Sequence, residues 1–396
     1  MLFFPSITFR LIDAEVFPWA LFFTLLCVII YNKISKAFLL LLFIFSLSAL
    51  YAAYLTEGEH LGQLTRSFLA YINSTFIIFT LAWFLNKTDN LIWFKKLLRF
   101  ILFFYIIVGL LQTLGFGVVF DPIIALLKER GGGSGVGSRG VSILSTEPSR
   151  AAYEFIFIYA MFRFLDNGRN NFLKDIFVGL FIVFIIKSAL GLIVYLVFMS
   201  FMHIKFKNLI NIALYATSTI ALIFLLNLLY DGGKVDYGNV RSIQIIIGLM
   251  SLDDLFTSFE YLVINSGFRG VSVISSYNQG LTTFFGYGVG NWEQSSLLAM
   301  KAMGIDEYSI GYFKYTCGQL LCPVRPTAYL AAFALDVGLI GFSFFIIYLL
   351  TLKVAFKAKP YKYFTIFCLL ISSVIGHPAP WMLLGILTIY QKKRVR

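Results

Sequence analysis

Residues 100–118 read FILFFYIIVGLLQTLGFGV, an apolar run without a charged residue. Backbone inside lipid must satisfy its own hydrogen bonds, so long apolar runs are typical of membrane-spanning helices. The alternating pattern of an outer-membrane β-barrel is absent. The rest of the chain is similar, since 59% of its 396 residues are hydrophobic and its mean hydropathy is +0.84. The sequence therefore predicts an all-α polytopic membrane protein.

About eleven apolar segments of this kind are expected to be transmembrane helices. They are residues 16–31, 37–55, 67–85, 100–118, 148–165, 175–187, 188–202, 209–229, 328–350, 363–376 and 381–391. The segments 175–187 and 188–202 are short for a hydrocarbon core of ~30 Å. They form either a hairpin of two short helices or one span interrupted by Lys187. We prefer the hairpin, because a single span would place the lysines of 353–362 on the outer face of the membrane, contrary to the positive-inside rule.

These segments divide the chain into five parts. They are N-terminal transmembrane helices (1–118), a first outer loop (119–147), central transmembrane helices (148–229), a large and partly helical outer loop (230–327) and C-terminal transmembrane helices (328–396). More than half of the 32 lysine and arginine residues lie in alternate connections and in the C-terminal tail. The positive-inside rule places that face and the C-terminus in the cytoplasm. The net charge of +12 then reflects topology, and nucleic acid is not an expected partner.

Two short stretches in the outer loops are near-copies of each other. RGVSILST at 139–146 recurs as RGVSVISS at 269–276, and each copy begins with an arginine, Arg139 or Arg269. Guanidinium groups bind phosphate oxygens through paired hydrogen bonds. Two similar cationic segments on one side of a bilayer suggest a protein that binds two similar anionic molecules.

The first outer loop ends in a motif that leads into a helix. Its glycine-rich run, 131–137, predicts a flexible hinge and is not a phosphate-binding P-loop, because no Gly-Lys-Ser/Thr follows. Glu147 precedes Pro148, which suits the first helical position. Glu147 is either an anion stabilised at the helix start by the helix dipole or a base that acts on a sugar hydroxyl. Arg150 is either a phosphate ligand or the partner of Glu147.

The second outer loop carries Arg269, Arg325 and the turn 285–292, FGYGVGNW. The aromatic residues Tyr287 and Trp292 of this turn either form a platform for a sugar ring or pack the turn. Cys317 and Cys322 lie on the oxidising side, which makes a small disulfide plausible.

The following apolar segment carries Asp336. An ionisable residue inside a span indicates function, and a polar contact between helices is the structural alternative. His60, His203 and His377 are far apart in sequence, so no metal site is expected.

These features together resemble the O-antigen ligase and polymerase superfamily, and most closely its Wzy-type O-antigen polymerases. The resemblance covers about residues 119–350. It rests on the segment from Arg139 to Arg150, on Arg269 followed by Gly280, on the Gly-x-Gly-x-Gly-Asn-Trp turn, and on the Asp-Val-Gly-Leu-Ile-Gly stretch at 336–341. The ligase branch has a histidine shortly before the Tyr-Leu pair that opens the later helix, and none precedes Tyr329 here. The polymerase branch is therefore favoured.

The resemblance implies a GT-C-like fold in the bacterial inner membrane, with both outer loops in the periplasm. It implies a glycosyltransferase that joins two undecaprenyl-diphosphate-linked oligosaccharides, the donor and the acceptor, by inverting transfer in lipopolysaccharide biosynthesis. No metal or cofactor is implied, and membrane lipid and a chain-length regulator protein are the further partners considered.

On this interpretation Arg139, Arg150, Arg269 and Arg325 bind diphosphate, Glu147 is the base and Asp336 is the reserve candidate. Tyr287 and Trp292 would contact sugar. The alternatives are an O-antigen ligase with a lipid A core acceptor, a lipid-linked-oligosaccharide flippase or other transporter, and a structural scaffold.

Overall fold

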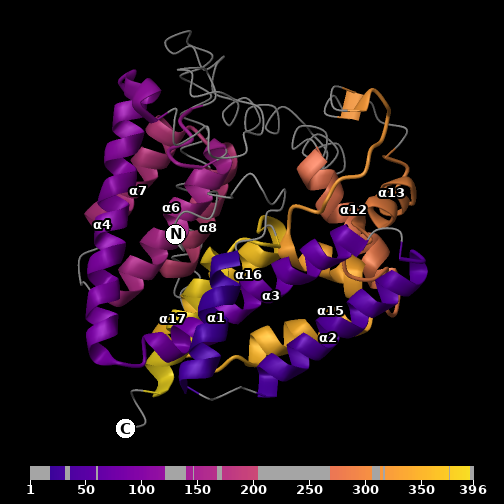
Figure 1. The fold of residues 1–396 in the computed structure, drawn as a ribbon. Coiled ribbons are helices and arrows are strands. Elements are labelled where there is room, and N and C mark those ends of the chain that lie inside the picture. Colours follow the sequence, from indigo (N-terminus) through magenta and orange to yellow (C-terminus); the bar gives the residue numbers. More distant parts are fainter. Residues whose placement is uncertain are drawn as a thin grey trace.

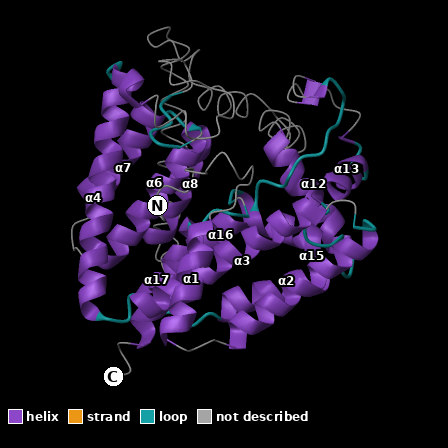
Figure 2. Ribbon diagram, viewed as in Figure 1, coloured by secondary structure: helices purple, strands orange, loops and turns teal. Residues whose placement is uncertain are grey.

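The computed structural model describes residues 18–31, 36–58, 61–120, 140–145, 147–166, 172–203, 268–305, 313–314, 317–373 and 375–392. All regular elements within these ranges are helical (Figure 2), which confirms the all-α prediction. The predicted segment 209–229, the glycine run 131–137 and Arg139 lie outside the described residues.

The helices are α1 (Pro18–Tyr31), α2 (Lys36–Leu55), α3 (Leu61–Phe84), α4 (Thr88–Thr113), η1 (Phe116–Phe120), α6 (Pro148–Asp166), α7 (Phe172–Leu180), η2 (Phe181–Ile186), α8 (Ala189–His203), α12 (Phe268–Thr282), α13 (Trp292–Lys301), α15 (Tyr329–Thr351), η4 (Phe356–Ala358), α16 (Lys359–Ile371) and α17 (Ala379–Lys392). Most helices lie within a few residues of a predicted apolar segment, but α4 begins twelve residues before 100–118, α16 ends five residues before the end of 363–376, and α12 and α13 lie in the predicted outer loop 230–327. In Figure 1, α4, α6, α7 and α8 stand side by side at the left, whereas α2, α3 and α15 run obliquely beside this group in the lower right part of the view.

Two of these helices are long and apolar enough to cross a membrane by length and composition, Leu61–Phe84 and Tyr329–Thr351. Shorter apolar helices occupy Leu39–Leu55, Leu190–Met202 and Ala379–Ile389.

The segments 175–187 and 188–202 form a hairpin, as preferred from the sequence. The backbone turns at Lys187, whose φ of 54° lies in the left-handed region. The Tyr195 hydroxyl of α8 then donates to the carbonyl of Asp175 in α7. One continuous helix would separate these residues by ~30 Å at 1.5 Å per residue, so the contact requires an antiparallel pair.

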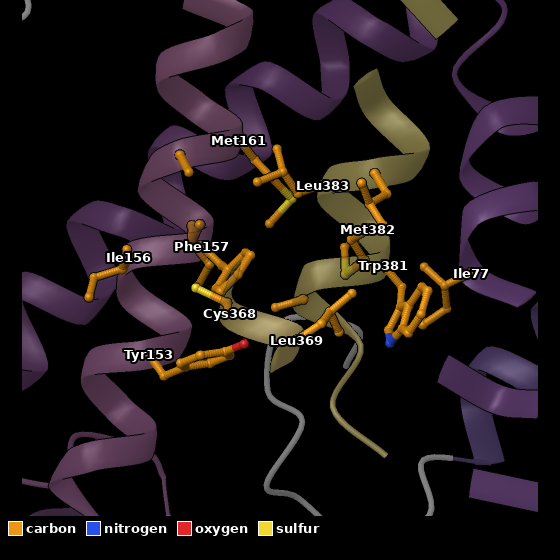
Figure 3. Packing of buried hydrophobic residues seen from close by; sticks show 14 of the residues in the cluster. Ile77, Tyr153, Ile156, Phe157, Met161, Cys368, Leu369, Trp381, Met382 and Leu383 are labelled. Atoms are coloured by element: carbon orange, nitrogen blue, oxygen red, sulfur yellow. The ribbon is translucent and has the colours of Figure 1, made fainter. Parts of the chain in front are cut away.

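Helix α6 is mostly buried. Its residues Ala151–Met161 are all buried, as expected for a helix that is apolar on every side. Figure 3 shows Phe157 of α6 beside Cys368 of α16 and Met161 of α6 beside Leu383 of α17, whose Trp381 is fully buried. The N-terminus of α6, which bears the predicted site, is therefore held in place by the core.

Helix α15 is broken at Gly338, where φ is 70° and ψ is −171°. The segment 283–288 fills the break. Its Tyr287 and Gly288 amides donate to the carbonyls of Leu335 and Asp336 at 3.0 and 2.8 Å, and the Leu339 amide donates to the Thr283 carbonyl at 2.8 Å. These backbone groups of the break are thus paired within the protein.

Close packing explains the glycines of this segment, which we call the strap (residues 283–291). A Cβ on Gly286 would lie 2.5 Å from the Gly338 nitrogen, and one on Gly288 would lie 2.5 Å from Ala52 Cβ of α2. Both glycines also have positive φ, which costs other residues free energy. The backbone of this turn is accordingly packed against α2 and α15 at Gly288 and Gly286.

The two near-copies at 139–146 and 269–276 do not share a conformation. Residues 140–145 are a non-helical loop, in which Gly140 and Ile143 both have positive φ. Residues 269–276 lie within α12. Tertiary packing thus gives the same sequence pattern two different local structures.

Candidate functional site at the start of α6

The loop before α6 is fixed by Gln112 at the end of α4. The Gln112 side chain donates to the Ile143 carbonyl at 2.8 Å and accepts from the Ile143 amide at 2.9 Å. Gly140 lies so close to the α7–α8 turn that a Cβ would be 2.0 Å from the Ile186 oxygen. These contacts fix the course of the chain as it approaches Glu147.

Helix α6 begins at Pro148, as predicted, and Glu147 stands at its start. The Glu147 carbonyl accepts the amides of Arg150 and Ala151, both at 3.1 Å. The positive end of the helix dipole favours an anion here. Arg150 Nε lies 3.7 Å from Glu147 Oε1, which places Arg150 as the partner of Glu147.

Arg269 joins the second polar segment to this helix start. It lies in the first turn of α12. Its Nη2 donates to Glu147 Oε1, and its Nη1 donates to Ser149 Oγ at 3.0 Å. We call Glu147, Ser149, Arg150 and Arg269 the α6–α12 cluster. The side chains of Arg269 and Glu147 are 32% and 23% exposed, so a ligand could reach the pair.

The spacing from Arg269 to Gly280 has a structural reason. Eleven residues make about three helical turns, so both residues lie on nearly the same face of α12. A Cβ on Gly280 would lie 2.4 Å from the Ala334 carbonyl carbon of α15. Gly280 thus permits the close approach of α12 to α15, and Arg269 lies near the other end of the same helix.

A second polar group lies between α3 and the chain around α15. Arg325 Nη2 donates to Ser67 Oγ at 2.8 Å, and Tyr71 Oη donates to Asp336 Oδ2 at 2.8 Å. We call Ser67, Tyr71, Arg325 and Asp336 the α3–α15 cluster. Asp336 is 3% exposed, so its polar contact between helices, the structural alternative, is what the structure records.

Arg325 differs from Arg269 in its partners. Among the described residues no ion pair of Arg325 within 4.0 Å is found, its Nη2 donates to Ser67, and its buried Nε has no hydrogen-bond partner. The structure therefore groups Arg150 with Arg269 at Glu147 and places Arg325 in the α3–α15 cluster, while Arg139 is outside the described residues.

The residues proposed to contact sugar lie at two points of the turn. Tyr287 Oη accepts a hydrogen bond from Gln279 at 2.5 Å, and Trp292 begins α13. Cys317 and Cys322 form a disulfide with a Cα–Cα distance of 6.4 Å, as anticipated.

Sequence reasoning missed Gln112, Ser67 and Tyr71 as contributors. A lone glutamine near the end of an apolar run, and polar residues four apart in α3, were the available signals.

The described residues contain no group of three or more His, Cys, Asp or Glu side chains that could hold a metal ion. The chain matches no family model, no curated protein and no solved structure.

Proposed function

We propose that this protein is a Wzy-type polymerase, a glycosyltransferase of the bacterial inner membrane that joins undecaprenyl-diphosphate-linked O-antigen repeats at the periplasmic face. The contact of Arg269 with Glu147 and Ser149 carries the proposal, because it brings a cation and a carboxylate from the two polar segments together. The C-terminus then lies in the cytoplasm.

Exposed apolar side chains support the membrane setting. Phe43, Phe100, Phe103 and Phe344 are each more than 60% exposed, and they lie on α2, α4 and α15. Apolar area of this extent on several helices fits contact with lipid tails. The proposal also includes about eleven membrane spans and a GT-C-like arrangement of the helices.

The chemistry begins with an exchange of partners on Arg269. Phosphate oxygens of the donor displace the Glu147 carboxylate from the guanidinium, which binds them through paired hydrogen bonds. Glu147 is then free beside the acceptor. The acceptor hydroxyl oxygen attacks the anomeric carbon, the bond from that carbon to the phosphate oxygen breaks, and the diphosphate leaves with the electron pair. Glu147 takes the hydroxyl proton.

The arginines stabilise the departing charge. Arg269 and Arg150 stand at the start of α6, and Arg325 and Arg139 are proposed to contact the same diphosphate or that of the acceptor. Fixed positive charge aimed at a leaving group contributes most where water is partly excluded. Asp336 remains the reserve base, and Tyr287 and Trp292 remain the proposed sugar contacts.

Substitution of Arg269 tests the proposal. We expect Arg269→Ala to reduce long glycan chains about 100-fold, the effect of losing one transition-state donor. Lys301→Ala is the matched control, since Lys301 is an exposed cation of the same polar segment. Normal chain lengths in Arg269→Ala, with protein present in the membrane, would refute the role of Arg269.

A charge swap separates chemistry from structure. In the double variant Glu147→Arg/Arg269→Glu the ion pair can re-form with its charges exchanged. If the pair only holds α12 on α6, the swap restores glycan polymerisation. If the pair is catalytic, protein level recovers while polymerisation stays lost, which is the result we expect.

A flippase for lipid-linked oligosaccharide is the second candidate. The break of α15 at Gly338 favours it, because discontinuous spans are typical of transporters. Lipopolysaccharide from a deletion strain distinguishes the functions. One repeat on the core indicates a polymerase, unattached polymer indicates a ligase, and the absence of any translocated repeat indicates a flippase.

A further inference from the structure

The chain between the end of α15 and the first turn of α16 carries four lysines and no acidic residue. Residues 353–362 read KVAFKAKPYK. Lys353, Lys357 and Lys359 are exposed. Among the described residues none of these three lysines makes an ion pair within 4.0 Å. The segment therefore presents positive charge that the protein itself does not neutralise.

Two lysines of other helices show the contrast. Lys95 Nζ of α4 lies 2.7 Å from Asp166 Oδ1, and Lys174 Nζ of α7 lies 2.8 Å from Asp166 Oδ2. One carboxylate thus compensates both of these cations. The lysines that follow α15 have no such partner, so an anion from outside the chain can bind them.

The backbone that carries these lysines is fixed. Lys362 is 5% exposed, and its Nζ donates to the carbonyls of Leu350 and Leu352 at 2.6 and 2.9 Å. Carbonyls at the end of a helix have no partner within that helix, so the ammonium group satisfies the end of α15. The fully buried Ala358 ends the short helix η4, where its amide donates to the Ala355 carbonyl at 2.8 Å. The exposed lysines therefore have defined positions.

An exposed aromatic ring lies among the lysines. Phe356 is 77% exposed, and Lys359 Nζ lies 5.2 Å from the centre of its ring. In α15 the exposed residues Phe344, Ile347 and Leu350 precede it. Intervals of three residues place these side chains on one face of the helix. The exposed apolar face of α15 is thus followed in the chain by an apolar ring and by unpaired cations.

This order of groups fits the surface of a membrane that contains anionic phospholipid. Apolar side chains contact the acyl chains, and lysine stems lie along apolar surface while their ammonium groups reach the headgroups. Clusters of lysine directly after a spanning helix bind anionic headgroups. An acidic soluble protein would complement the lysines, but the apolar face that leads to Phe356 would gain nothing from it.

We infer that residues 353–359 form a binding site for anionic phospholipid. The ring of Phe356 lies among the acyl chains, and the ammonium groups of Lys353, Lys357 and Lys359 bind oxygens of the headgroup phosphate. The inference rests on the membrane setting of the proposed function and not on glycosyl transfer. A chain that failed the glycan tests above could still bind this lipid, so the two proposals fail separately.

Native mass spectrometry of the full chain, with phosphatidylglycerol or phosphatidylcholine added, tests the site. We expect tighter association of phosphatidylglycerol. Each lysine should contribute about fivefold, so Lys357→Gln/Lys359→Gln should weaken phosphatidylglycerol about 25-fold and leave phosphatidylcholine unchanged. Lys95→Gln/Lys174→Gln is the matched control, because both lysines already bind Asp166. Equal weakening in the two double variants, or none in the first, would overturn the inference.

Variants of the ring separate lipid from a soluble acidic partner. Phe356→Ser should weaken the association of phosphatidylglycerol, because a hydroxyl does not enter the acyl region. Phe356→Leu keeps an apolar side chain and should retain the association. Full association in Phe356→Ser would exclude the ring from the lipid site and would assign the lysines to a soluble acidic partner instead.

Two measurements on the unchanged chain keep the test decisive if a variant does not fold. A higher concentration of ammonium acetate should weaken the association of phosphatidylglycerol and leave that of phosphatidylcholine as it was. Inorganic phosphate at the concentration of the lipid should not displace phosphatidylglycerol, because it has no acyl chains. Equal salt effects on both lipids, or displacement by phosphate, would contradict a phospholipid site.

Discussion

Replacing Gly280 by alanine should loosen the packing of α12 on α15. The added Cβ would lie 2.4 Å from the Ala334 carbonyl carbon, 2.5 Å from its oxygen and 2.6 Å from the Leu335 nitrogen. All three are backbone atoms, so no side chain can rotate away. Favourable contact between such atoms needs about 3.5 Å, so the two helices must separate by ~1 Å.

Two opposing terms set the size of the effect. Alanine improves helix propensity by about 1 kcal/mol relative to glycine. Overpacking costs about 1–3 kcal/mol, and rigid backbone places this site at the upper end. We therefore expect a net loss of about 1–2 kcal/mol in the free energy of unfolding. The displacement would also lengthen the 3.0 Å contact between Arg269 and Ser149 beyond hydrogen-bond range.

Melting in nanodiscs measures this loss. For a chain of this length, 1–2 kcal/mol corresponds to a decrease of about 1–3 °C. Gly62→Ala is the control, because Gly62 lies in α3 with no atom within 4 Å of an added Cβ. The control should be neutral or stabilised. An unchanged or raised melting temperature in Gly280→Ala would refute the packing argument.

Three further outcomes are expected. Asp175→Asn should lower the free energy of unfolding by about 3–5 kcal/mol, because it removes the ion-pair partner of the mostly buried Arg163. Asp166 is better exposed, so Asp166→Asn should cost less than about 1 kcal/mol. Similar losses in melting experiments on the two variants would contradict this. Gly338→Ala should sharply reduce the amount of protein recovered from membranes. The added Cβ would lie 2.3 Å from the strap backbone, and φ at this position is positive. Normal recovery would argue against the break in α15. Mass spectrometry without reduction should show Cys317 and Cys322 protected from alkylation, and labelling of either thiol would exclude the disulfide.

The helices could be predicted because apolar runs dominate the chain. Segment 148–165 became α6 almost residue for residue, with Pro148 at its first position as expected. The meeting of Glu147 with a distant arginine was also anticipated, since both flank spans on one predicted face.

Features that depend on backbone packing could not be predicted. The break of α15 appears in the sequence as an ordinary glycine in an apolar run, and only the strap shows why the helix can open there. The helical conformation of 269–276 could not be derived from its likeness to 139–146, because a shared pattern does not specify a shared local structure. The meeting of His377 with Glu154 needs two segments whose pairing no local spacing encodes.

The strap has a consequence for how the protein is made. Residues 283–291 leave the ribosome before α15, and the α2 residues Ser48 and Ala52 that the strap touches leave earlier still. On the proposed membrane topology, a broken span that entered lipid alone would carry exposed peptide groups, at a cost of several kcal/mol for each. Chain order instead makes the partner available first, so the nascent span can be received by a surface already formed. Placing residues 283–291 after α15 in a permuted chain would remove this order of synthesis.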